Sequence, residues 1–222
     1  MTLILFDVDG TLVDSQNLIV AAQREAFQAL GLEPPSRERS LSIVGLSLVE
    51  AFTTLAGARA PVAELAQAYR DAVHRMREEP EDREPLYEGA GALVADLAGR
   101  EGITLGIATG KPRRGVDHLL RRKRWHGIFA TIQTADDAPS KPDPTMLRQA
   151  MAEVDAAPGS TVMIGDTSFD MAMARAAGVK AIGVSWGYHA VAALREAGAD
   201  VIVDRLDQLP EALGLAAMPG VA

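Results

Sequence analysis

Segment 3–11 constrains this chain more than any other stretch. Four apolar residues, Leu3–Phe6, run directly into two carboxylates at Asp7 and Asp9, and Gly10 follows. An unbroken apolar run predicts a strand that is buried on both faces, and the glycine predicts a sharp exit from it. Two carboxylates at one strand end repel each other unless a cation or a shared proton lies between them. The segment therefore predicts a site rather than a surface.

Composition excludes several classes of function. The 222 residues include no cysteine, which rules out disulfides, thiol catalysis and cysteine-ligated zinc. The net charge of −8 argues against nonspecific binding to nucleic acid or an anionic membrane, but not against a small anionic substrate. No apolar stretch approaches the length of a membrane span, and the first one lacks a basic flank and breaks at Asp7. We expect a cytoplasmic protein without a signal peptide, either a monomer or a homodimer.

Strand patterns alternate with helical patterns along most of the chain. The predicted strands are Leu3–Phe6, Ile103–Ala108, Thr131–Gln133, Val162–Ile164, Ala181–Val184 and Val201–Val203. Strands that alternate with helices indicate βαβ units, and hence a doubly wound, mostly parallel, Rossmann-like α/β sheet. Such sheets place their sites at the carboxyl ends of the strands.

Residues 15–86 depart from this plan because their periodicity is helical. The apolar residues that recur at three- and four-residue steps are Val62, Leu65, Ala66, Tyr69, Val73 and Met76, and earlier Ile19, Ala22, Ala26 and Leu30. We expect an inserted all-helical cap domain over 15–86 and an α/β core formed by 1–14 and 87–222. The chain would enter the cap near Asp14 and leave it near Glu84–Gly89.

Three further motifs follow the first one at 7–11, and each carries polar residues where an element ends or begins. The second motif is 107–111, the third is 140–144 and the fourth is 164–170. Their candidate functional residues are Thr109, Gly110, Lys111, Lys141, Asp166 and Asp170. Asp7, Asp9 and Asp166 would offer the hard oxygen ligands that suit Mg²⁺. The Thr109 hydroxyl and the Gly110 N–H would donate to phosphate oxygens, while Lys141 would neutralise the phosphate and hold the nucleophile. This set of groups predicts phosphoryl transfer to an aspartate.

In this order, the four motifs resemble those of the haloacid dehalogenase superfamily, specifically its magnesium-dependent phosphatases. The family pattern of Asp-x-Asp-Gly-Thr, Ser/Thr, Lys and Gly-Asp-x-x-x-Asp is met at every position. The resemblance covers nearly the whole chain, since the helical insertion matches the family's cap, and 44–48 and 183–188 resemble the phosphoglycolate-phosphatase-like group. It implies Mg²⁺-dependent hydrolysis of a small phosphate monoester, with phosphoglycolate as the first substrate candidate. It also implies a moving cap, with hinges near Asp14 and Pro85–Gly89.

The resemblance also implies a role for each acid. Asp7 would be the nucleophile that becomes an aspartyl-phosphate. Asp9 would be the general acid for the leaving alcohol and then the base for the attacking water, and its backbone carbonyl would touch the metal. Asp166 would bind Mg²⁺ directly, while Asp170 would hold a water on the metal or orient Lys141.

Basic residues outside these motifs are weaker candidates. Lys111 would either reach a substrate phosphate or lie on the surface. Arg37 and Arg39 precede Val44-Gly45. If that loop faces the site, one of the two arginines could bind a substrate carboxylate or a second phosphate, and we choose Arg39 as the candidate. The run 121–124 falls at a predicted helix C-terminus, where cations are favoured, and we interpret it as a solvated helix end.

Three rival functions remain on the same fold. A dehalogenase would lack the second acid of the first motif, so Asp9 speaks against it. A phosphosugar mutase would transfer its phosphoryl group to a second hydroxyl, and the sequence does not separate it from a hydrolase. A catalytically silent regulator would bind a phosphorylated ligand without turnover, which the four intact acids disfavour.

Overall fold

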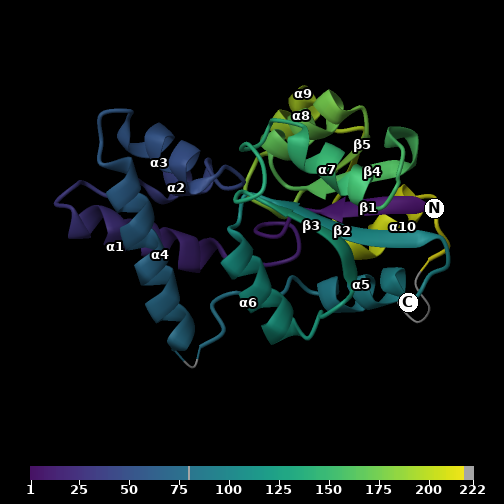
Figure 1. The fold of residues 1–222 in the computed structure, drawn as a ribbon, viewed down its shortest axis with the longest axis horizontal. Coiled ribbons are helices and arrows are strands. Elements are labelled where there is room, and N and C mark those ends of the chain that lie inside the picture. Colours follow the sequence, from purple (N-terminus) through teal and green to yellow (C-terminus); the bar gives the residue numbers. More distant parts are fainter. Residues whose placement is uncertain (80, 218–222) are drawn as a thin grey trace.

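The computed structural model describes residues 1–79 and 81–217 and shows a parallel sheet with a separate group of helices at one end (Figure 1). The six strands are β1 (Thr2–Phe6), β2 (Ile103–Thr109), β3 (Phe129–Thr134), β4 (Thr161–Gly165), β5 (Lys180–Val184) and β6 (Val201–Val203). They lie in the order β3-β2-β1-β4-β5-β6, and every pairing is parallel. This is the doubly wound α/β arrangement, and all six predicted strands are confirmed.

Helices cover both faces of the sheet. They are α5 (Ala90–Ala98), α6 (Arg113–Lys123), α7 (Thr145–Glu153), α8 (Ser168–Ala177), α9 (Val191–Ala197) and α10 (Leu209–Ala212). Ile4 and Phe6 pack in one apolar cluster with α5, α6 and α10, whereas Leu3 and Leu5 pack in another with α7, α8 and α9. The alternation follows from the two-residue period of a strand, and it explains the unbroken apolar run of β1.

Four more helices form the inserted cap, α1–α4. They are α1 (Gln16–Ala29), α2 (Arg37–Leu41), α3 (Leu48–Ala56) and α4 (Val62–Glu78). The cap has two apolar clusters of its own, around Phe52 and around Leu18, so its helices are held together by one another. No helix within the described residues is long and apolar enough to cross a membrane.

The two links between cap and core run side by side. Val13 forms a bridge with Leu86, the Asp14 N–H donates to the carbonyl of Pro85, and the Tyr87 N–H donates to the carbonyl of Leu12. The cap is thus joined to the core by two short paired segments beside the end of β1. That the links act as hinges, and that domain boundaries fall there, remain predictions.

Candidate functional site

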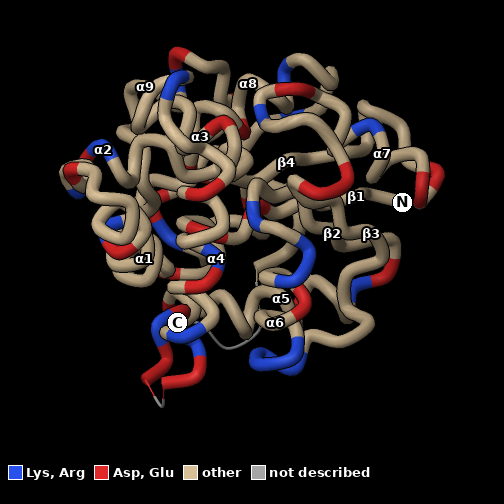
Figure 2. Tube along the Cα trace, turned by 60° about the vertical axis from the view of Figure 1, so that its left-hand side comes forward, with Lys and Arg blue, Asp and Glu red and all other residues tan. Residues whose placement is uncertain are grey.

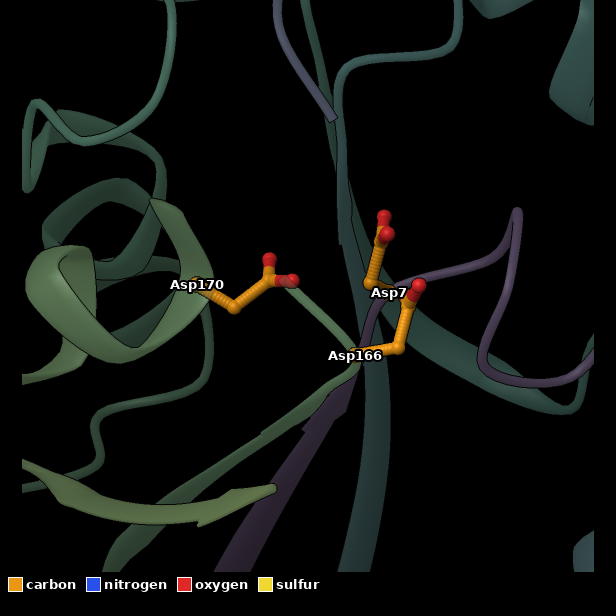
Figure 3. A group of neighbouring side chains, drawn as sticks. All are labelled: Asp7, Asp166 and Asp170. Carbon is orange, nitrogen blue, oxygen red and sulfur yellow. The ribbon is translucent and has the colours of Figure 1, made fainter. Parts of the chain in front are cut away.

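Three buried carboxylates meet at the carboxyl ends of β1 and β4 (Figure 3). Asp7 follows β1, Asp166 follows β4, and Asp170 belongs to the first turn of α8. One ligand oxygen from each lies within 4.8 Å of the others. In Figure 3 the carboxylates of Asp7 and Asp166 point the same way, and that of Asp170 reaches toward them from α8. We call Asp7, Asp166 and Asp170 the acidic triad.

Strand register and a glycine bring the triad together. Phe6 pairs with Ile164, and the Asp7 N–H donates to the Ile164 carbonyl at 2.9 Å, so both strands end at the same level. Gly10 has a φ of +88°, and a Cβ built there would lie 2.2 Å from Oδ2 of Asp166. Only glycine allows this turn to pack against the Asp166 carboxylate.

The two later acids are held in place by hydrogen bonds. Asp166 accepts from the Thr11 hydroxyl at 2.9 Å and from the Tyr188 N–H at 2.8 Å. Asp170 accepts from the N–H and the hydroxyl of Thr167 in a capping box at the start of α8. Both carboxylates therefore have fixed orientations.

Asp7 is held differently. The Lys141 Nζ lies 2.9 Å from Oδ1 of Asp7 and 2.6 Å from Oδ1 of Asp170, and it is completely buried. Apart from this ammonium, neither Asp7 oxygen has a hydrogen-bond donor among the described residues. Burial, partly opposed by Lys141, raises the pKa of Asp7 to about 6, and burial together with Asp7 raises the pKa of Asp166. Burial by itself would lower the pKa of Lys141, but Asp170 and Asp7 raise it.

This donor set fits a hard divalent cation. Three carboxylates face one lysine, and apart from that lysine the two Asp7 oxygens have no hydrogen-bond donor among the described residues. Mg²⁺ takes oxygen ligands and would relieve both problems.

Asp9 faces a second charged cluster. It accepts from the Ser15 hydroxyl at 2.7 Å and from Lys111 Nζ at 2.8 and 3.0 Å. Lys111 also donates to Glu84 at 2.9 Å, and Glu84 accepts two hydrogen bonds of 2.7 Å from Arg77 in α4. We call Asp9, Lys111, Glu84 and Arg77 the ion-pair chain. It runs from the end of β1 to the last turn of α4.

The ion-pair chain keeps Glu84 and Lys111 charged despite burial. Burial raises the pKa of Glu84, but Lys111 and Arg77 outweigh it and leave this pKa well below its usual range. Burial likewise lowers the pKa of Lys111, and Asp9 and Glu84 reverse the shift and raise it. Removing one member would therefore leave a buried charge without its partner.

A loop of the cap lies over the second motif. A Cβ built on Gly110 would come within 2.3 Å of the Gly45 carbonyl oxygen, so the two backbones are in close contact. The Ser47 N–H donates to the Ser140 hydroxyl at 2.8 Å, and the carbonyl of Ser42 lies 3.2 Å from Nε2 of His189. The cap is thus closed onto the core in this structure.

A cavity of about 340 Å³ lies between the cap and the core. The core lines it with Asp7, Asp9, Thr109, Gly110 and Lys111. The cap lines it mainly with apolar side chains from α1, from the loop 43–46, and from α3 and α4. Its rim includes Arg114 and Arg121, which lie near the two ends of α6, where Figure 2 shows basic residues in blue. The predicted basic run 121–124 does fall at the C-terminal end of α6.

The predicted site residues do not all gather at this cavity. Thr109 lines it, and its hydroxyl accepts from the Lys111 N–H at 3.2 Å, which leaves the hydroxyl proton free to donate. Lys111 lines it too, but its ammonium already faces Asp9 and Glu84. Arg39 does not line it, because its guanidinium turns away and donates to the Leu55 carbonyl at 3.1 Å. The position of Arg39 gives no support to the predicted grip on a substrate anion.

Sequence reasoning missed four residues that contact the candidate acids or the cation beside them. Ser15 directly precedes α1, but its side chain makes no cap hydrogen bond and donates to Asp9 instead. Glu84 and Arg77 contribute the far half of the ion-pair chain, and Tyr188 contributes a backbone N–H to Asp166. Of these residues, only Ser15 could have been noticed in the sequence, as a polar residue beside Asp14. The other contacts depend on how distant segments pack.

Comparisons with known proteins agree with this geometry. The family model for haloacid dehalogenase-like hydrolases matches residues 4–184. The probable phosphatase IndB of Dickeya dadantii is 34% identical over 93% of this chain and 91% of its own length, and the pyrophosphatase PpaX of Bacillus mycoides is 31% identical over 93% and 94%. A crystal structure of a hydrolase from Pseudomonas syringae superposes with a TM-score of 0.85 at 27% identity, over 98% of this chain and 100% of that one. The chain therefore belongs to the haloacid dehalogenase-like hydrolases.

Proposed function

We propose that this hydrolase is an Mg²⁺-dependent phosphatase that cleaves a small phosphate monoester through an aspartyl-phosphate on Asp7. The observation that carries the proposal is the setting of Asp7. Apart from the Lys141 ammonium beside Oδ1, its two oxygens lack a hydrogen-bond donor among the described residues, and it lines the cavity between cap and core. A nucleophile needs such unengaged lone pairs within reach of a bound substrate.

The acidic triad would hold the metal, together with the backbone carbonyl of Asp9 that the family resemblance implies. Bound Mg²⁺ would offset the negative charge of the carboxylates, so that a phosphate dianion can approach them. The Thr109 hydroxyl and the Gly110 N–H would donate to the phosphate oxygens, and Lys141 would neutralise part of their charge. Lys111 is a poor phosphate ligand because its ammonium is already engaged.

The reaction would follow two balanced steps. In the first, an Asp7 carboxylate oxygen bonds to phosphorus, the bond from phosphorus to the alcohol oxygen breaks, and Asp9 gives its proton to the leaving alcohol. In the second, Asp9 takes a proton from water as the water oxygen bonds to phosphorus, and the bond between phosphorus and Asp7 breaks. Inorganic phosphate leaves, and both acids return to their starting states.

The contacts of Asp9 suit the second step. Ser15 and Lys111 both donate to its carboxylate, which fixes its orientation apart from the acidic triad. Asp9 would thus exchange its proton from a fixed position while Asp7 attacks.

Two substrates head the candidates. Phosphoglycolate follows from the resemblance of the sequence to the phosphoglycolate-phosphatase-like group. Pyrophosphate follows from the name of the PpaX relative. A phosphosugar mutase is the alternative on the same fold, and it would interconvert hexose 1- and 6-phosphates without net release of phosphate.

The proposal is tested by phosphate release from phenyl phosphate with added Mg²⁺ and with excess chelator. We expect turnover with Mg²⁺ and its loss in chelator, because the acidic triad then repels the phosphate dianion. Phosphoglycolate, pyrophosphate and the hexose phosphates are then ranked by kcat/KM. Undiminished turnover in chelator would contradict the role of the metal, and hexose phosphate interconversion would replace the hydrolase by a mutase.

A further inference from the structure

Most of the residues that the cap contributes to the cavity wall are apolar. The side chains that the cap contributes to it include Ile19, Val44, Leu48, Phe52 and Val73. Phe52 also stacks edge-on against Tyr69, with ring centroids 5.7 Å apart. Apolar walls of this kind favour an apolar ligand body over a charged one, because a charge buried there would lose its hydration without a partner.

Gln23 is a polar side chain that lines the cavity beside these apolar residues. Gln23 lies on α1 one turn beyond Ile19, so both present the same helix face, and both line the cavity. Only 3% of its surface is exposed. Its Nε2 donates to the Ser40 carbonyl at 3.5 Å, while its Oε1 has no donor among the described residues.

The Ser40 carbonyl fixes which end of the amide is which. Exchanging the oxygen and the nitrogen of Gln23 would bring two acceptors face to face, so the end without a partner is the carbonyl oxygen. A buried carbonyl without a donor destabilises a fold, and an apolar side chain of the same size would avoid that cost. A glutamine at this position is therefore better explained by a donor that arrives with a ligand.

We propose that the alcohol part of the substrate combines an apolar body with a hydroxyl or amine group that donates a hydrogen bond to Oε1 of Gln23. This inference rests on the proposed phosphatase function and goes beyond it by assigning a chemical class to the leaving group. The apolar body packs against the cap wall, the phosphate faces Asp7, and Gln23 selects for the donor.

The same wall argues against pyrophosphate. A second phosphate pointing toward the cap would meet apolar side chains and the acceptor oxygen of Gln23. The two largely buried cations that line the cavity, Lys111 and Arg77, are engaged with Asp9 and Glu84, while Arg70, Arg114 and Arg121 are exposed. Among the described residues that line the cavity, each largely buried Lys or Arg is thus already paired with a carboxylate.

A matched set of aryl phosphates tests the proposal. Phenyl phosphate has an apolar leaving group without a donor, and its three hydroxyphenyl isomers add one hydroxyl at different positions. For each enzyme we take the ratio of kcat/KM for the best isomer to kcat/KM for phenyl phosphate, with Mg²⁺ present. Comparing this ratio between enzymes removes differences in the intrinsic reactivity of the leaving groups.

The decisive variant is Gln23→Met, which keeps the length of the side chain and removes the acceptor. We expect its ratio to fall about fivefold to tenfold below that of the wild type, as for one hydrogen bond to a buried group. Gln149→Met is the matched control. Gln149 also donates through Nε2 to a backbone carbonyl, that of Asp137, and also has a buried Oε1 without a donor, but it lies outside this cavity.

Each outcome decides the proposal. A ratio that falls in Gln23→Met and holds in Gln149→Met supports it, and thermal unfolding of Gln23→Met at or above the wild-type Tm shows that the change is not misfolding. Equal ratios in the wild type and Gln23→Met overturn the proposal, and so does a wild type that prefers none of the isomers. In either case, turnover of phenyl phosphate still supports the phosphatase function. Failure to hydrolyse all four esters overturns both.

Discussion

Asp7 and Asp9 are two residues apart in the sequence, yet their surroundings are opposite in character. Asp7 lies in the acidic triad, and apart from the Lys141 ammonium it has no hydrogen-bond donor among the described residues. Asp9 accepts hydrogen bonds from Ser15 and Lys111 and belongs to the ion-pair chain. The short turn after β1 thus separates one acid suited to attack from another suited to move a proton.

The raised pKa of Asp7 predicts a specific pH dependence of stability in chelator. Because this pKa rises from 3.8 to about 6 on folding, the folded protein keeps a proton that the unfolded chain has lost between those values. The wild type should therefore lose stability as the pH rises through this window. Asp7→Asn does not titrate and should lack this loss, so its stability relative to the wild type should grow by up to about 3 kcal/mol.

Denaturant unfolding of both proteins across the window measures this difference. Mg²⁺ should diminish it, because a bound cation favours the carboxylate form of Asp7. A stability difference that does not change with pH in chelator would mean that Asp7 is not desolvated among like charges.

At the scale of elements, the end of α4 is tied to the end of β1 through Glu84. Arg77, in the last turn of α4, pairs with Glu84, and Lys111 connects Glu84 to Asp9. The cap is also pressed onto Gly110 by its loop 42–47. Two independent contacts therefore connect the position of the cap to the proposed catalytic residues.

Breaking the ion-pair chain at Glu84 should destabilise the fold. Glu84→Gln removes the shared anion and leaves two buried or partly buried cations, Arg77 and Lys111, so we expect a loss of about 3 kcal/mol in the free energy of unfolding. The exposed Glu88, changed to Gln in the same linker, is the control and should alter stability by less than about 0.5 kcal/mol. Equal stability of the two variants would show that the pairs contribute nothing.

Closure of the cap should depend on the lack of a side chain at Gly110. Gly110→Ala places a methyl group against the Gly45 carbonyl, so the cap loop must move off the second motif. A displacement of about 1 Å near the reacting groups can lower kcat/KM about 100-fold. Gly159→Ala is the control, because a Cβ there has no neighbour within 4 Å. Wild-type kcat/KM in Gly110→Ala would show that closure onto Gly110 is not needed for turnover.

At the scale of the whole molecule, the sequence predicted the parts that local patterns determine. The apolar runs located all six strands, and the motifs at the ends of β1, β2 and β4 met at one edge because parallel strands share that edge. The triad of Asp7, Asp166 and Asp170 follows from that rule together with the helical turn that separates Asp166 from Asp170.

The remaining contacts could not be predicted from local patterns. Lys111 follows Gly110 directly, but its turn toward Asp9 depends on Glu84, whose place is set by the link that leaves the cap. Arg39 was expected to reach the site if the loop after it faces the site, and Gly45 in that loop does lie against Gly110. Its side chain instead reaches the C-terminal end of α3, where the Leu55 carbonyl accepts from it. Such choices depend on tertiary packing, which periodicity does not encode.

The central claim is that Asp7 carries the phosphoryl group, and trapping the phosphorylated enzyme tests it most directly. The wild type and Asp7→Asn are mixed with phenyl phosphate and Mg²⁺, quenched in acid during turnover and digested, and the peptides are weighed by mass spectrometry. We predict a phosphorylated peptide that contains Asp7 in the wild type, and neither that peptide nor turnover in Asp7→Asn, since an amide is a poor nucleophile. Wild-type turnover by Asp7→Asn, or phosphate trapped on a peptide without Asp7, would contradict the claim.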